Sequence, residues 1–179
     1  MKVILIAGKA LSGKDTAAKM IEENLKQKKE KVLIIHFADL LKYICKQYFN
    51  WNGEKNNFGR DLLQYVGTNV IRKQRPDYWV DFVIDFLSMF KNQWDYVIIP
   101  DCRFPNEIDK WREGDWEIIA VKINRLNFKT PLTLEQQAHP SEVALDSYQN
   151  FDYVINSESG IENLSKAVNE FLKFLDNYN

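Results

Sequence analysis

The chain alternates between short continuous apolar runs and longer segments in which apolar residues are spaced among polar ones. Short apolar runs rich in β-branched residues predict strands over residues 2–7, 31–37, 95–100, 117–123 and 152–155. These runs are nearly continuous in hydrophobicity, which is typical of parallel strands that helices cover on both faces. The pattern therefore predicts a parallel sheet of five strands.

The segments between these runs repeat apolar residues every three or four positions, which predicts helices. The longest stripe runs from Trp79 to Phe90, and others lie within 17–25, 41–48, 62–70 and 161–175. Alternating strands and helices predict a layered α/β fold with right-handed crossovers. No repeat, low-complexity tract or linker interrupts the order, so we predict a single domain over residues 1–179.

The sequence GKALSGKDT follows the first predicted strand. Gly8 and Gly13 bracket four residues and precede Lys14, which matches the G-x-x-x-x-G-K core of a phosphate-binding loop between a strand and a helix. Such a loop directs backbone N–H groups and a helix N-terminus at phosphate oxygens. The motif predicts binding of a nucleoside triphosphate, with Lys14 on its β- and γ-phosphates; a glycine-rich turn beside a solvated lysine is the alternative.

Asp15 stands where such loops usually carry a serine or threonine hydroxyl. A carboxylate is also a hard oxygen ligand, so Asp15 could bind Mg²⁺ directly or through water, with the Thr16 hydroxyl one residue later. A carboxylate beside a phosphate is repulsive unless a cation lies between them, which favours metal dependence. The alternative is an acid that the helix dipole favours in the first turn.

Ligands of parallel α/β sheets bind outside the carboxyl ends of the strands. The third predicted strand ends at Asp101, where phosphate-binding-loop proteins place an acid that holds Mg²⁺, and Arg103 could clamp a phosphate. A plain turn before Pro105 is the alternative. The polar loop with Asn156, after the last strand, could pack on an adenine ring, because no guanine-reading N-K-x-D pattern is present.

Two further segments carry candidate cations. Arg60 and Arg72 are twelve positions apart and hence about 120° apart around a regular helix, so they could share an anion only if the helix breaks at Gly67. The polar segment 125–140, which begins with Arg125, could be a lid over phosphates or an ordinary connector. The sequence HPSE, residues 139–142 at the end of this segment, could suggest hydrolytic chemistry, but a helix N-cap at Ser141 explains it more simply.

Composition limits the partners. A formal net charge of −1 argues against binding to a nucleic acid polymer or an anionic membrane, and the apolar N-terminal run is too short to span a bilayer. The two cysteines, Cys45 and Cys102, are expected to be free and buried in a reducing, cytoplasmic setting. Exposed helices could build a homodimer face, although no stripe is distinguishable from core.

Six segments together resemble the deoxynucleoside monophosphate kinases of bacteriophages and related P-loop kinases: SGKDT, FADLLK, GRDLLQYVGT, PDYWV, DCRFPNE and HPSE. The resemblance runs from about residue 3 to 175, and Asp15 is normal for this family. It implies a three-layer P-loop NTPase fold, a phage or its host as the source, and transfer of the ATP γ-phosphoryl group to a deoxynucleoside 5′-monophosphate with Mg²⁺. SGKDT is shared with animal-type phosphomevalonate kinase, so another phosphorylated metabolite as acceptor, or a non-catalytic ATP-dependent binding module, stays open.

The resemblance also implies roles for individual residues. Asp101 would orient the metal or the acceptor, Arg103 and Arg125 would neutralise the transferring group, and a lid would cover about 125–140. The ATP phosphates and Mg²⁺ would be held by Gly8, Ser12, Gly13, Lys14, Asp15 and Thr16. The acceptor would bind in a helical segment, about residues 40–90, that contains Asp39, Arg60, Gln64, Arg72 and Trp79.

Overall fold

The computed structural model describes residues 1–54 and 56–178, which form two compact units. The first unit comprises Met1–Ile35 and the chain from Lys91 onwards, and the second comprises His36–Phe90. Within the described residues, no helix is both long enough and apolar enough to cross a membrane.

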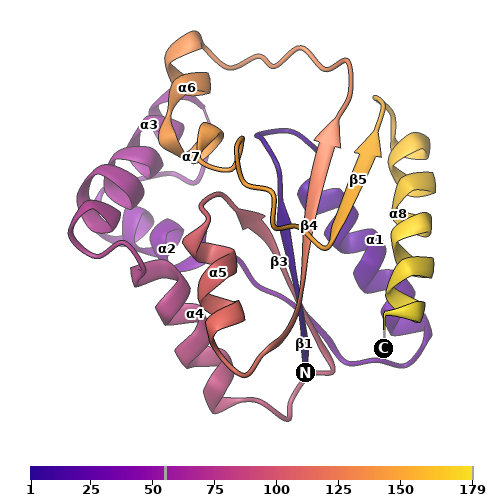
Figure 1. Ribbon diagram of the computed structural model, residues 1–179. Helices are drawn as coiled ribbons and strands as arrows, with labels where there is room; N and C mark the ends of the chain where they lie inside the picture. The colour runs from indigo at the N-terminus through magenta and orange to yellow at the C-terminus, as the bar shows by residue number, and fades with distance from the viewer. Residues whose placement is uncertain (55, 179) are drawn as a thin grey trace. The chain divides into compact units, whose positions relative to one another are not determined.

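The first unit is built on a parallel sheet of five strands in the order β2-β3-β1-β4-β5 (Figure 1). Every residue of the central strand, β1, is buried, and its neighbours pair with it in parallel on both sides. This confirms the predicted α/β class and its five-stranded parallel sheet. The strands are β1 (Lys2–Ala7), β2 (Val32–Ile34), β3 (Tyr96–Cys102), β4 (Glu117–Arg125) and β5 (Tyr153–Ser157).

Helices cover both faces of this sheet, which explains the continuous hydrophobicity of its strands. Helices α1 (Lys14–Gln27) and α8 (Ile161–Asn177) pack side by side on one face, where Ile21 and Phe171 join Ile4 and Val121 in the core (Figure 1). Helix α5 (Asn106–Glu113) lies on the opposite face and buries Ile108 and Trp111. The short helices α6 (Leu134–Ala138) and α7 (Pro140–Val143) precede β5.

The second unit is helical throughout its regular structure. It contains α2 (Ala38–Tyr48), α3 (Asn57–Gln64), the π-helix η1 (Tyr65–Arg72) and α4 (Tyr78–Met89). Helix α3 passes directly into η1, so the helix does not break at Gly67, the condition on which a shared anion of Arg60 and Arg72 depended. The indole N–H of Trp79 donates to the Gly67 carbonyl oxygen at 3.1 Å, which satisfies an acceptor in the widened turns.

Some boundaries and burials differ from the sequence predictions. The second strand is shorter than predicted because the backbone N–H of His36 donates to the Asp39 carboxylate and starts α2. Phe82 and Phe90, predicted within the buried face of α4, are exposed, and Val80 is buried instead. Cys45 and Cys102 are free and buried, as predicted.

Candidate phosphate-binding site

The loop between β1 and α1 has the conformation that its glycines permit. Gly8 and Gly13 have φ angles of 155° and 95°, in the region that favours glycine, and Leu11 also has a positive φ of 61°. A Cβ on Gly8 would lie 2.7 Å from both the Ile123 carbonyl oxygen and the Ser12 hydroxyl. The backbone at Gly8 therefore approaches β4 more closely than any side chain would allow.

Lys14 is the first residue of α1 and is only 6% exposed. Its ammonium donates to the carbonyl oxygens of Gly8 and Lys9, both at 2.8 Å. Burial, followed by the nearby Arg103 guanidinium, lowers the pKa of Lys14 from 10.5 to about 7. The carboxylates that raise this pKa are those of Glu142, Asp15 and Asp101. All of these charged groups thus lie close enough to Lys14 to affect its charge, near the carboxyl ends of β1 and β3.

Two arginines flank the loop. Arg103 follows β3, and its guanidinium donates to the Glu142 carboxylate at 2.9 Å. Arg125, the last residue of β4, donates to the Leu11 carbonyl oxygen at 3.0 Å, and its guanidinium carbon lies 3.9 Å from the centre of the Phe128 ring. A cation from each neighbouring strand therefore stands beside the phosphate-binding loop.

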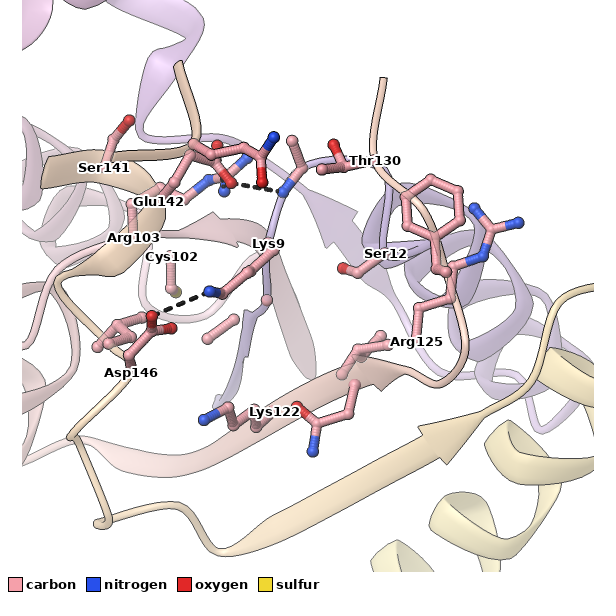
Figure 2. Close-up of a pocket in the computed structure, with 18 of the residues that line it drawn as sticks. Lys9, Ser12, Cys102, Arg103, Lys122, Arg125, Thr130, Ser141, Glu142 and Asp146 are labelled. Atoms are coloured by element: carbon pink, nitrogen blue, oxygen red, sulfur yellow. Dashed lines mark hydrogen bonds and ion pairs between the residues drawn. The ribbon is translucent and has the colours of Figure 1, made fainter. Parts of the chain in front are cut away.

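The segment that contains α7 is tied to the same loop by two contacts, which Figure 2 shows. The Ala10 backbone N–H donates to the Glu142 carboxylate at 2.8 Å, and the Lys9 ammonium pairs with Asp146 at 2.9 Å. The side chain of Glu142 is 8% exposed. The sequence predicted no separate role for Glu142; its only signal was that HPSE is one of the six segments that carry the family resemblance.

The N-cap of α7 is His139, so the predicted cap at Ser141 is wrong. The Ser141 backbone N–H donates to Nδ1 of His139 at 3.2 Å, and the Ser141 hydroxyl is 2.9 Å from the same nitrogen. Burial lowers the pKa of His139, which favours the neutral ring that this acceptor role requires. His139 and Ser141 thus start a helix turn.

A cavity of about 460 Å³ opens beside the loop, on the side of β4 and the segments before β5 (Figure 2). Three of its cationic side chains, Lys9, Lys122 and Arg125, come from the loop and β4, and Phe128 and Phe151 add aromatic surface. The volume is in the range of small-molecule sites, and the cationic side chains are suited to an anion.

The residues predicted to hold a metal ion lie around Lys14. Asp15 is exposed in the first turn of α1, Thr16 follows it half-buried, and Asp101 lies half-buried near the end of β3. Among residues 1–54 and 56–178, no three histidine, cysteine or acidic side chains converge as a preformed metal centre. Two carboxylates near a phosphate site fit Mg²⁺, which binds few protein ligands and completes its shell with phosphate oxygens and water.

The predicted acceptor residues all lie in the second unit. Asp39 lies in the first turn of α2, and although burial opposes its ionisation, hydrogen bonds from His36 and Lys42 hold the pKa of Asp39 below its usual range. Arg72 donates to the Pro76 carbonyl oxygen at 3.0 Å, and Trp79 is buried.

Arg60 and Gln64 of α3 are half-buried, and within the described chain the Arg60 guanidinium makes no hydrogen bond or ion pair. The guanidinium N–H groups of Arg60 are therefore available to an acceptor phosphate. In the first unit, the predicted adenine contact Asn156 is exposed, and its side-chain oxygen accepts from the Asn124 amide at 3.1 Å.

The amino-acid sequence of this chain is similar to one family of known proteins. A family model described as deoxynucleotide monophosphate kinase matches residues 34–168. A protein of Acanthamoeba polyphaga mimivirus, whose name places it among deoxynucleotide monophosphate kinases, is 31% identical over 88% of this chain and 89% of its own length. The deoxynucleotide monophosphate kinase of Enterobacteria phage T4 is 30% identical over 65% of this chain, but the match spans only 46% of that protein.

Solved structures resemble the chain over nearly its whole length. Shikimate kinase from Aquifex aeolicus aligns over 99% of this chain and 98% of its own, with a TM-score of 0.53 and 16% sequence identity. At that identity the likeness concerns the fold alone, which is that of a P-loop kinase.

Proposed function

Because the chain belongs to the deoxynucleotide monophosphate kinase family, we propose that it transfers the γ-phosphoryl group of ATP to a deoxynucleoside 5′-monophosphate. The products are a deoxynucleoside diphosphate and ADP. The observation that carries the proposal is the placement of buried Lys14 and of Arg103 at the phosphate-binding loop of a chain in this family.

Phosphoryl transfer needs positioning and charge neutralisation more than covalent catalysis. An oxygen of the acceptor phosphate attacks the γ-phosphorus as the bond to the β-γ bridging oxygen breaks, and ADP leaves with that electron pair. Lys14 would exchange the carbonyl oxygens of Gly8 and Lys9 for phosphate oxygens, and Arg103 and Arg125 would neutralise the charge on the transferring group. The buried Ser12 hydroxyl, which has no hydrogen-bond partner in the described chain, is available to a phosphate oxygen.

Mg²⁺ would be held by Asp15, by Asp101 and by the Thr16 hydroxyl, directly or through water. When bound, it would neutralise charge on the phosphate oxygens. The segment 125–140 would act as the lid, and Asn156 would lie at the adenine. Because the guanidinium of Arg125 already contacts the Leu11 carbonyl oxygen, this arginine is available to the phosphates without a large movement.

We assign acceptor binding to the second unit. Arg60 and Gln64 of α3 are the polar side chains best suited to the acceptor phosphate. Arg72, at the end of η1, would contribute to the acceptor site without sharing that phosphate, because the helix does not break at Gly67. Asp39 is ionised and could accept hydrogen bonds from a base or a sugar. Trp79 would support this surface from inside, since it is buried and its indole N–H is engaged with the Gly67 carbonyl.

ATP binding is expected to take up a proton at Lys14. With a pKa of about 7, the ammonium is mostly deprotonated at pH 8, and phosphate oxygens beside it would restore the charge by raising this pKa. Calorimetric titration of ATP with Mg²⁺ at pH 8, in Tris and in HEPES, should therefore give an uptake approaching about 0.9 proton. At pH 6, where Lys14 is already charged, the uptake should largely disappear; equal enthalpies in both buffers at pH 8 would contradict the prediction.

The decisive test of function is a coupled ADP-release assay with ATP, Mg²⁺ and each of dAMP, dCMP, dGMP and dTMP. Turnover of at least one deoxynucleotide, above the rate of ATP hydrolysis alone, is expected. Phosphomevalonate and the matching ribonucleotides belong in parallel reactions. Turnover of phosphomevalonate alone would transfer the proposal to another acceptor, and ATP binding without any transfer would indicate a nucleotide-gated binding module.

A further inference from the structure

Glu142 joins two parts of the site that lie far from it in the sequence. One carboxylate oxygen accepts from the backbone N–H of Ala10 in the phosphate-binding loop at 2.8 Å. The other accepts from the Arg103 guanidinium at 2.9 Å, while the side chain is 8% exposed. Hydrogen bonds with an ionised partner are stronger than neutral ones, and removing one partner of a buried pair leaves an uncompensated charge.

The charge of Arg103 requires a nearby anion, because Arg103 lies beside the buried Lys14. Its guanidinium lies close enough to Lys14 to disfavour the charge on that ammonium, so the two cations repel each other. An anion nearby stabilises both, and Glu142 is one of the carboxylates that does so. Only Nη1 of Arg103 is engaged with Glu142, which leaves further guanidinium N–H groups for a phosphate.

On the basis of the proposed function, we propose that Glu142, held in place by the backbone N–H of Ala10, is a positioning residue that orients Arg103 toward the transferring phosphate. It needs no contact with either substrate to do this. Both carboxylate oxygens are used, one for each partner, and a glutamine has a single acceptor oxygen. Glu142→Gln therefore cannot keep both contacts, although its size is unchanged.

A purely structural brace would have a different signature. If Glu142 only stiffened the loop, its loss would weaken binding of ATP and ADP alike, because both nucleotides occupy the loop with their α- and β-phosphates. Orientation of Arg103 concerns the γ-phosphate, which ADP lacks. The ratio of the ADP and ATP dissociation constants thus separates the two roles, and it can be measured without an acceptor.

The test compares the natural chain with Glu142→Gln, Arg103→Gln and the double variant. Each single variant should lower kcat by about 10- to 100-fold and reduce the preference for ATP over ADP. The double variant should be within about threefold of Arg103→Gln, because residues that act as one unit are not additive. The matched control is Glu170→Gln, which breaks an exposed ion pair with Lys173 on α8 and should change neither quantity.

Additive losses in the double variant, or natural kcat and ATP preference in Glu142→Gln, would overturn the proposal. If the natural chain phosphorylates no deoxynucleotide, the proposed function fails, but the ratio of dissociation constants still tests the role of Glu142. If thermal melting shows that Glu142→Gln does not fold, Glu142→Asp gives the same readouts. It keeps the charge but is one methylene too short to span both Ala10 and Arg103.

Discussion

Replacing Lys14 with methionine is expected to lower kcat by about two to three orders of magnitude, as loss of a preorganised donor to transition-state charge commonly does. The ammonium is the buried cation of the phosphate-binding loop, and it also donates to the carbonyl oxygens of Gly8 and Lys9. Methionine matches the four-atom stem of the lysine side chain but has neither the charge nor the donors. The measurement is ADP release with the best deoxynucleotide acceptor.

The same variant should remain folded, and the reason lies in the sign of the Lys14 pKa shift. The pKa falls from 10.5 to about 7 in the folded chain, so folding disfavours the charged form. This lysine therefore lowers the free energy of unfolding at and below pH 7, and its penalty fades as pH rises from about 7 toward 10.5. Removing the charge removes the penalty, and urea unfolding at pH 7 should show no large loss of stability.

The control for this prediction is Lys19→Met, on an exposed position of the same helix. It should leave turnover and stability close to those of the natural chain, because surface substitutions usually have small effects. Turnover of Lys14→Met within about threefold of the natural value would contradict the assignment of Lys14. So would a loss of activity that coincides with loss of cooperative unfolding.

The sheet and the phosphate-binding loop could be predicted because their signals are local. Residues 3–7 are hydrophobic without alternation because both faces of β1 are buried, and this shows directly in five consecutive letters of the sequence. The spacing of Gly8, Gly13 and Lys14 reports a backbone conformation that few other sequences permit. Helix α5 was missed because it buries only two large apolar residues, Ile108 and Trp111, which is too few for a stripe.

The rest of the site depends on contacts that no local pattern records. Ala10 and Glu142 are 132 positions apart, so the sequence near either residue does not predict their hydrogen bond. The π-helix could not be predicted for the same reason, because it depends on contacts with distant residues. The Trp79 indole donates to the Gly67 carbonyl oxygen, and Leu41 approaches Gly67 closely. The 3.6-residue period of apolar positions predicts a continuous helix there but does not distinguish an α-helix from a π-helix.

Gly59→Ala is expected to destabilise the chain, against the helix propensities. Alanine is favoured over glycine inside a helix by about 1 kcal/mol, so residue 59 of α3 would ordinarily gain from the change. Here a Cβ would lie 2.1 Å from the Glu54 carbonyl oxygen and 2.6 Å from the indole nitrogen of Trp51. The indole N–H donates to that same carbonyl at 3.0 Å, and Trp51 is 5% exposed, so neither group can move alone.

The expected loss in the free energy of unfolding is about 2 to 3 kcal/mol, the usual cost of forcing atoms into a packed site. Urea unfolding followed by tryptophan fluorescence measures it. Gly67→Ala is the matched control, because the atom nearest its Cβ, at 2.6 Å, is Cδ2 of Leu41, the end of a flexible side chain. Its effect should stay below about 1 kcal/mol, because the leucine can change rotamer. If the two variants lose stability equally, or Gly59→Ala gains it, close approach of the backbone is not what requires a glycine at 59, and helix propensity decides.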